Sequence, residues 1–267
     1  MMMNHYSMTQ LAASVAGALG AEAPEKSGPA MPAVQQLVQD AFGGPADRVL
    51  IYNPDCIGLW FWQKYTELFL PVQRYTQLAV PVATVMPAVT PVCFGTMYTG
   101  AMPAVHGIQS YTKPVIQIDS LFDSLARSGK KVALIAVEDS SMAKIFLGRD
   151  IDYYLLPDDA AVTEKGLELV KEDRYDLIVV YNQEYDDMIH DYTPEHPKAM
   201  EAAKRHVESF DRLCRAVKEH WRSHDAMVVW AADHGNHLDW DGHGNHGEWR
   251  EEDINTIHFY GVLPRAH

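Results

Sequence analysis

The last part of the chain concentrates residue types that bind metal ions. Seven of the thirteen histidines lie between His224 and the C-terminus. Within this region, the segment from Asp239 to Glu248 (DWDGHGNHGE) contains glycines, acids and imidazoles and almost no apolar side chains. Because such a loop has little to pack into a core, we interpret it as a segment ordered by a divalent cation. A solvated polar loop is the alternative interpretation of this segment taken alone.

Further acids and histidines follow apolar runs elsewhere in the chain. Asp233 and His234 come directly after one run, and Asp55 closes an Asn-Pro-Asp sequence after another. Asp186 and His190 follow a third run and are four residues apart, which would place them on one helix face, close enough to share an ion. Each signal is weak alone, because acids are also common in turns and in first helical turns. Their combination predicts a metal site at one edge of a sheet.

A hydroxyl nucleophile is available in the segment from Pro87 to Ile108. This segment follows an apolar run over 80–85 and is typical of a turn from a strand into a helix. Thr90 opens the predicted helix, where its hydroxyl and the helix N-terminus would face an anion. The pattern also predicts Thr90 as the N-cap of this helix and Thr99-Gly100 as its C-cap.

These residues need a scaffold, and the sequence predicts an α/β one. Near-continuous apolar runs that end in polar residues are typical of strands buried on both faces of a mostly parallel sheet. Helices are expected over 119–129 and over 197–221, where apolar residues recur in steps of three and four. We therefore predict a three-layer α/β/α sandwich, in which ligands bind beyond the carboxyl ends of the strands. The expected strands are Val49–Tyr52, Val132–Val137, Leu177–Tyr181, Met227–Ala232 and Thr256–Val262.

No linker or internal repeat divides the chain. We expect one domain over residues 1–267, with 1–45 as an N-terminal helical segment packed on it and no inserted cap domain. The hydrophobic content of 47% is ample for a buried core. The net charge of −14 argues against a nucleic-acid polymer as partner, because such binding depends on clustered Lys and Arg.

Three widely spaced cysteines, Cys56, Cys93 and Cys214, indicate reduced thiols and a cytoplasmic location. No apolar run is long enough for a membrane helix, so no membrane association is expected. The Ala-rich stretch from Leu11 to Ala23 lacks the basic residues that precede a secretion signal. We interpret it as a small helix that ends at Gly20.

The ordered motifs resemble the alkaline phosphatase superfamily over residues 48–262. The resemblance is greatest to the type I phosphodiesterase/nucleotide pyrophosphatase branch, and more distant to the sulfatases and the cofactor-independent phosphoglycerate mutases. It implies an alkaline-phosphatase-like fold. The resemblance rests on Asp55, on Thr90 with Thr99-Gly100, Pro103 and His106-Gly107-Ile108, on Asp186…His190, on Asp233-His234-Gly235 and on His246-Gly247.

The resemblance implies two metal sites and a threonine nucleophile. Asp186, His190 and His246 would hold one ion, with His243 as the alternative to His246. The other ion would be held by Asp55, Asp233 and His234, with Thr90 between the two ions. Zinc suits this mixed ligand set, and manganese is the alternative. The implied activity is hydrolysis of a small phosphate ester through a phosphothreonine intermediate, as in a phosphodiesterase or nucleotide pyrophosphatase.

The chain departs from the family pattern in its phosphate contacts. Phosphodiesterases of the family usually carry an Asn three residues after the nucleophile, where this chain has Cys93, a weak donor. Tyr111 and Lys113 are the other candidates for substrate binding. Thr90 argues against a sulfatase, and the short span from Gly100 to Asp186 disfavours a phosphomutase. A phosphomonoesterase, a phosphomutase and a non-catalytic metal-binding protein stay open as alternatives.

Two further segments have more than one interpretation. The aromatic run from Leu59 to Tyr65 is expected to be core or subunit interface, and a substrate-stacking surface is the alternative. The segment from Leu11 to Pro24 resembles one that superfamily members carry after the last histidine. A rearranged chain order and an unrelated helix both explain it. The possibility of a homo-oligomer is left open.

Overall fold

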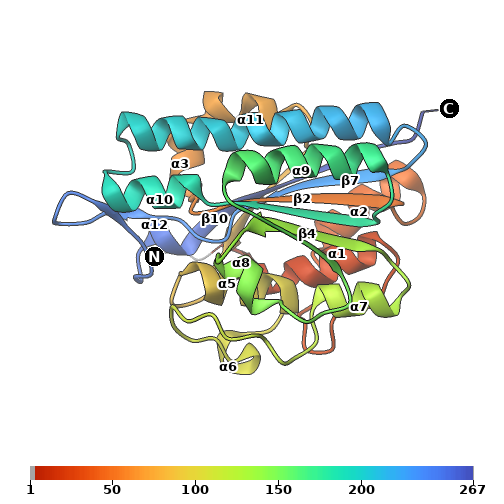
Figure 1. Ribbon diagram of the computed structural model, residues 1–267, viewed down its shortest axis with the longest axis horizontal. Coiled ribbons are helices and arrows are strands. Elements are labelled where there is room, and N and C mark those ends of the chain that lie inside the picture. The colour runs from red at the N-terminus through yellow and green to blue at the C-terminus, as the bar shows by residue number, and fades with distance from the viewer. Residues whose placement is uncertain (1–3, 267) are drawn as a thin grey trace.

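A computed structural model describes residues 4–266 and shows an eight-stranded sheet between two layers of helices (Figure 1). The strand order is β1-β3-β10-β7-β2-β6-β4-β5, and only β10 runs antiparallel to its neighbours in this sheet. A separate hairpin joins β8 (His237–Leu238) to β9 (Gly244–Asn245). The sheet strands are β1 (Tyr6–Ser7), β2 (Arg48–Pro54), β3 (Leu78–Ala83), β4 (Val132–Val137), β5 (Asp152–Leu156), β6 (Leu177–Asn182), β7 (Ala226–Ala231) and β10 (Asn255–Leu263).

The helices divide between the two faces of the sheet, as Figure 1 shows. One face is covered by α1 (Leu11–Ala18), α2 (Pro32–Phe42), α5 (Thr90–Thr99), α7 (Leu121–Arg127) and α8 (Ser141–Ile145). The other is covered by α3 (Leu59–Lys64), α4 (Leu70–Gln73), α9 (Asp159–Glu172), α10 (Glu184–Asp191) and α11 (Pro197–His220). Two short helices, α6 (Pro103–His106) and α12 (Glu251–Ile254), lie in the connections.

Burial on both faces explains why the strands are apolar throughout. In β2, Val49 and Ile51 pack into one core, and Leu50 and Tyr52 pack into the core on the opposite face. All four side chains are inaccessible to solvent. Successive residues of a strand point to opposite faces, so a strand under helices on both sides needs an apolar residue at every position.

The predicted α/β sandwich with a mostly parallel sheet is confirmed. β4 has the predicted bounds, and the other four expected strands overlap β2, β6, β7 and β10. The apolar run over 80–85 overlaps β3. The sequence analysis did not identify β5, because this edge strand is partly exposed and contains Asp152 and two tyrosines instead of an apolar run. The two-residue strand β1 is too short to leave a pattern.

The N-terminal segment is part of the core. β1 pairs in parallel with the end of β3, and α1 packs against α2, α5 and α7. α1 is followed by Gly20, with φ of +67°, which is consistent with the predicted end of this helix. In the aromatic run from Leu59 to Tyr65, Phe61 is fully buried and belongs to the core.

The three cysteines are unpaired, buried thiols. Among residues 4–266, no helix combines the length and the apolar character needed to cross a membrane.

A buried histidine under α11 links the stability of this fold to pH. Tyr185 N–H donates to Nε2 of His206, at 3.3 Å, so the neutral ring carries its proton on Nδ1 and donates it to the Tyr52 hydroxyl, at 2.9 Å. Burial, together with the neighbouring Arg205, lowers the pKa of His206 to about 3. The folded state therefore favours the neutral ring, and its contribution is complete above the unfolded pKa of about 6.5 and is lost as the pH falls. Between pH 7 and pH 5 we expect a loss of about 2 kcal/mol in unfolding free energy from this group.

Urea denaturation of His206→Gln at both pH values would measure this contribution. The variant is expected to be less stable at pH 7 but to lose less stability on acidification than the wild-type protein. His5→Gln, at an exposed position, is the control and should keep the wild-type dependence. An unchanged pH dependence in His206→Gln would show that other groups, such as buried His258, carry the effect.

Candidate metal centre

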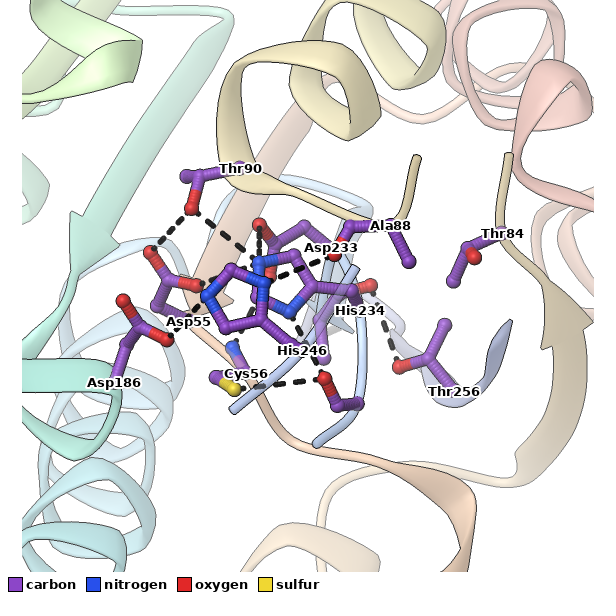
Figure 2. Close-up of polar contacts among 12 residues, drawn as sticks. Asp55, Cys56, Thr84, Ala88, Thr90, Asp186, Asp233, His234, His246 and Thr256 are labelled. Carbon is purple, nitrogen blue, oxygen red and sulfur yellow. Dashed lines mark hydrogen bonds and ion pairs between the residues drawn. The ribbon is translucent and has the colours of Figure 1, made fainter. Parts of the chain in front are cut away.

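The carboxyl ends of β2, β6 and β7 and the start of α5 meet at one edge of the sheet (Figure 2). Asp55 is the residue after β2, and Asp233 and His234 follow β7. Thr90, the first residue of α5, places its Oγ1 atom 3.5 Å from Asp55 Oδ2 and 3.3 Å from His234 Nε2. The predicted hydroxyl thus lies among the predicted acids and imidazoles.

Asp55, Asp233 and His234 form one compact cluster. His234 Nε2 lies 3.4 Å from Asp55 Oδ1 and 3.3 Å from Asp233 Oδ2. The backbone N–H of Cys56 donates to the other oxygen of Asp233, at 3.1 Å, which ties the loop after β2 to the loop after β7. Donor atoms from all three side chains lie within 4.8 Å of one another, so one ion could bind all three.

Asp186, His190 and His246 form a second cluster beside the first. His246 Nε2 lies 3.3 Å from Asp186 Oδ1 and 3.2 Å from His190 Nε2, and His190 lies 3.5 Å from Asp186 Oδ2. The ring of His246 stacks on that of His234, with centroids 4.1 Å apart, and its Nδ1 is 3.0 Å from the carbonyl of Ala88. Donor atoms of Asp186, His234 and His246 lie within 4.8 Å of one another, so one ion could bind all three and His234 connects the two clusters. His190 is not part of this closest group.

His243, the alternative to His246, lies elsewhere. It is exposed and borders an outer cavity with His190, Asp239 and Asp241. In the part of the chain that the structure describes, it belongs to neither ligand cluster. The geometry therefore favours His246 over His243.

The buried oxygens of this site fit divalent cations. One oxygen each of Asp55, Asp186 and Asp233 is buried without a hydrogen-bond partner among the described residues. Burial, with the nearby Asp233 and Asp186, raises the pKa of Asp55 well above its usual range. Burial, partly offset by the Cys56 N–H, raises the pKa of Asp233 to about 7. Close buried carboxylates that resist ionisation are what bound cations would neutralise, and the Asp/His donor set suits zinc-type ions.

The two imidazoles differ in charge preference. Burial, together with the charge on His246, lowers the pKa of His234 to about 3, so His234 is neutral and can act as a ligand. Burial also disfavours the charged form of His246, but the carboxylate of Asp186 outweighs it and raises the pKa of His246 to about 9. His246 thus supplies Asp186 with positive charge that an ion could replace.

A cavity of about 180 Å³ opens beside Thr90 and contains two of the three predicted substrate contacts. Tyr111 and Lys113 border it, and Lys113 donates to the carbonyl of Asp139, at 3.0 Å. Cys93, a residue of α5, does not border the cavity, because its side chain is fully buried in the apolar core between this helix and the sheet. The structure therefore places Cys93 away from any ligand in this cavity.

The predicted capping role of Thr90 is wrong. α5 begins at Thr90 itself, and Val89 is the N-cap residue. The hydroxyl of Thr90 contacts Asp55 and His234 instead of the backbone of its own helix. Gly100, with φ of +69°, ends the helix as predicted.

One tyrosine at this site was missed. Tyr181, the next-to-last residue of β6, is buried, borders the cavity and donates its hydroxyl hydrogen to Asp55 Oδ2. Its place inside an apolar run made it indistinguishable from a core residue. Only its nearness to the end of the run, where polar groups gather, could have indicated a role in the site.

No curated protein matches this chain. Residues 150–264 match the sequence model of the metalloenzyme superfamily. This part of the chain is thus similar to the metalloenzyme superfamily. The matched stretch contains five of the seven residues predicted to bind metal: Asp186, His190, Asp233, His234 and His246.

Solved structures of known proteins share the fold of this chain. Phosphonoacetate hydrolase from Sinorhizobium meliloti 1021, in complex with phosphonoformate, superposes with a TM-score of 0.58 at 19% identity, over 75% of this chain and 60% of the hydrolase. Murine ectonucleotide pyrophosphatase/phosphodiesterase 5 gives 0.56 at 18%, over 72% of this chain and 58% of its own. An inactive threonine-to-alanine variant of the murine protein, in complex with AMP, gives 0.57 at 18%, over 72% and 58%. This chain thus spans about three-fifths of each of these structures.

The glycine after His234 is required by a close backbone approach. A Cβ atom on Gly235 would lie 1.9 Å from the carbonyl oxygen of Glu252 and 2.9 Å from Cα of Gly58. Gly235→Ala must therefore displace the loop that carries Asp233 and His234. We expect a loss of about 2–3 kcal/mol in unfolding free energy and a fall in bound metal, measured by denaturation and elemental analysis. Gly44→Ala, where an added Cβ meets nothing within 4 Å, is the control; equal behaviour of the two variants would contradict the expectation.

Proposed function

We propose that this protein is a two-metal phosphoric-ester hydrolase of the phosphodiesterase/nucleotide pyrophosphatase type, with Thr90 as its nucleophile. The observation that carries the proposal is the position of Thr90 Oγ1, in contact with Asp55 and His234 and beside both clusters. The murine relative supports it, since its threonine-to-alanine variant is described as inactive. The fold and the metalloenzyme-superfamily match support it independently of this geometry.

The residues of the chain supply positioning and charge. Asp55 and His234 hold the Thr90 hydroxyl at the mouth of the cavity, and Tyr181 fixes the Asp55 carboxylate. Because Thr90 is the first residue of α5, negative charge on its Oγ1 lies at the positive end of the helix dipole. Divalent cations bound by the two clusters would lower the pKa of the hydroxyl and offset charge on the phosphoryl group.

The reaction then proceeds in two displacements. Thr90 Oγ1 forms a bond to phosphorus while the bond to the leaving alcohol breaks, which gives a phosphothreonine. Water then attacks the same phosphorus, releases phosphate or a phosphomonoester and restores Thr90. Lys113 borders the cavity and supplies a positive charge for an anionic substrate.

The finer features of the proposal follow from the same residues. We propose zinc as the ion, with manganese as the alternative, and a small phosphate ester as the substrate instead of a polymer. The acidic net charge of −14 supports this exclusion of nucleic acid. Three reduced, buried cysteines support a cytoplasmic location. A single domain over residues 1–267 is a further proposal.

Chromogenic esters test the function. Protein loaded with zinc or manganese is incubated with p-nitrophenyl phosphate and with bis-p-nitrophenyl phosphate, and nitrophenolate release is followed. We expect turnover that chelation abolishes and metal restores, with a higher kcat/KM for the diester. Preference for the monoester would identify a phosphomonoesterase. Full metal occupancy without turnover of either ester would leave a metal-binding protein, and incomplete occupancy would contradict the two clusters as sites.

A further inference from the structure

A larger cavity adjoins the catalytic one. It has a volume of about 510 Å³ and lies beyond the carboxyl ends of β4 and β6, under the helices α9, α10 and α11. These three helices cover the same face of the sheet (Figure 1). A cavity of this size is in the range that holds a small organic ligand.

The floor of this cavity is polar, unlike the core around it. Asn182 and Thr163 are almost fully buried, at 2% and 1% exposed, and both border it. Asn182 donates to Thr163 and Thr163 donates to Ser209, at 3.0 and 3.2 Å, whereas Asn182 Oδ1 has no hydrogen-bond partner among residues 4–266. An unpaired buried amide oxygen costs free energy.

The rim of the cavity is negatively charged. Five carboxylates border it, against the two guanidinium groups of Arg205 and Arg212. Arg205 is engaged by Glu184 at 2.6 and 2.7 Å, and Arg212 by Glu164 at 2.6 Å, so neither is left to attract an anion. The other bordering carboxylates are Asp158, Asp159, Asp187 and Glu208. Backbone N–H groups donate to Asp158 and Asp159, Gln183 donates to Asp187, and Lys204 lies 3.8 Å from Glu208. Carboxylates still outnumber cations around the cavity, which favours a cation as ligand.

Two residues belong to both cavities. Gln183 and Asp187 border the large cavity and the one that contains Thr90 and Asp186. Their side chains are joined by a hydrogen bond of 3.2 Å from Gln183 Nε2 to Asp187 Oδ2, and they form the wall between the cavities. A substrate that spans this wall would have its phosphoryl group at Thr90 and its organic group in the larger cavity.

We infer that this cavity binds the organic group of the substrate and selects one that carries an amine. The inference rests on the proposed function, because that function places the phosphoryl group at Thr90. The protonated amine would lie among the bordering carboxylates. Esters with a carboxylate in the same position would be repelled.

A series of p-nitrophenyl diesters tests the selection, because the reacting group stays constant. The second alcohol is 2-aminoethanol, ethanol or 3-hydroxypropanoate, and kcat/KM is measured for each on the metal-loaded enzyme. We expect the aminoethyl ester to exceed the ethyl ester by about tenfold and the carboxylate ester to be the poorest, which corresponds to a charge effect of about 1.4 kcal/mol. Equal values for the aminoethyl and ethyl esters, or preference for the carboxylate, would overturn the inference.

A binding measurement separates this inference from the proposed function. Calorimetric titration of metal-loaded Thr90→Ala with 2-aminoethyl phosphate, ethyl phosphate and 3-phosphonooxypropanoate needs no turnover. If affinity falls from the aminoethyl to the ethyl to the carboxylate ligand while the wild-type enzyme hydrolyses no ester, the inferred amine binding is supported and the proposed hydrolase function is refuted. If the wild-type enzyme turns over esters but the three ligands bind equally well, amine selection by the larger cavity is refuted and the hydrolase function stands.

A charge reversal on α11 locates the effect. Glu208 borders the cavity, and Glu219 lies three turns further along the same helix, exposed and outside it. Glu208→Lys should lower kcat/KM for the aminoethyl ester at least fivefold, raise it for the carboxylate ester and change it least for the ethyl ester. Glu219→Lys should leave all three values unchanged. Equal effects of the two variants would show that selection depends on net charge and not on the cavity.

Discussion

Thr90→Ala is expected to lower kcat for phosphate esters by at least about 10³-fold, while the protein keeps about two metal ions per chain. The hydroxyl is the atom that must bond to phosphorus, and it lies in contact with both Asp55 and His234. The methyl and hydroxyl groups of Thr90 pack at the start of α5 without capping it, so their removal leaves the helix start intact. Nitrophenolate release measures the first quantity and elemental analysis the second.

Thr90→Ser is the matched variant, because it keeps the hydroxyl and loses only the methyl group. It should retain within about tenfold of the wild-type rate, and a brief reaction quenched in acid should leave phosphate bound to residue 90 in both proteins. Survival of activity in Thr90→Ala would reassign the nucleophile, and a water molecule activated at the clusters would then be the alternative. Loss of metal in Thr90→Ala would mean that the side chain has a structural role as well.

The parts of this molecule that were predictable from sequence are those set by local pattern and order. β4 is apolar at every position, and β6 is apolar from Leu177 to Val180, because helices cover both faces of the sheet. The end of each such run marks a carboxyl edge, which is why Asp186 and Asp233 could be placed together before the fold was known. β5 could not be found, because an edge strand packs on fewer neighbours and tolerates Asp152 and exposed tyrosines.

The site residues that escaped prediction depend on contacts between distant parts of the chain. Tyr181 reaches Asp55 across 126 positions, and nothing in its own run marks this contact. Cys93 stands where the family pattern has a phosphate contact, yet its side chain packs into the core under α5. Residue type and spacing indicate on which face of a helix or strand a side chain lies. How deeply that side chain is buried depends on tertiary packing, which the sequence pattern does not show.

His246→Ala should lower kcat by at least about 10²-fold and reduce bound metal towards one ion per chain. His246 Nε2 is within 3.3 Å of both Asp186 and His190. Removal of this side chain leaves the second cluster with only Asp186 and His190. A lost cation withdraws several kcal/mol of charge stabilisation from the phosphoryl group, which corresponds to a factor of this size. His246 is also the contact between the late loop and Ala88, so we expect the loop to be less protected from hydrogen exchange.

His243→Ala is the control that the chain itself provides. It removes the same side chain from the same loop, three residues away, at an exposed position outside both clusters. Activity and metal content should stay at the wild-type values. If His243→Ala lost the ion and His246→Ala kept it, the late loop would have to rearrange on metal binding, with the hairpin of β8 and β9 turning His243 towards Asp186. The contact of His246 with Ala88 would then be a feature of the metal-free protein alone.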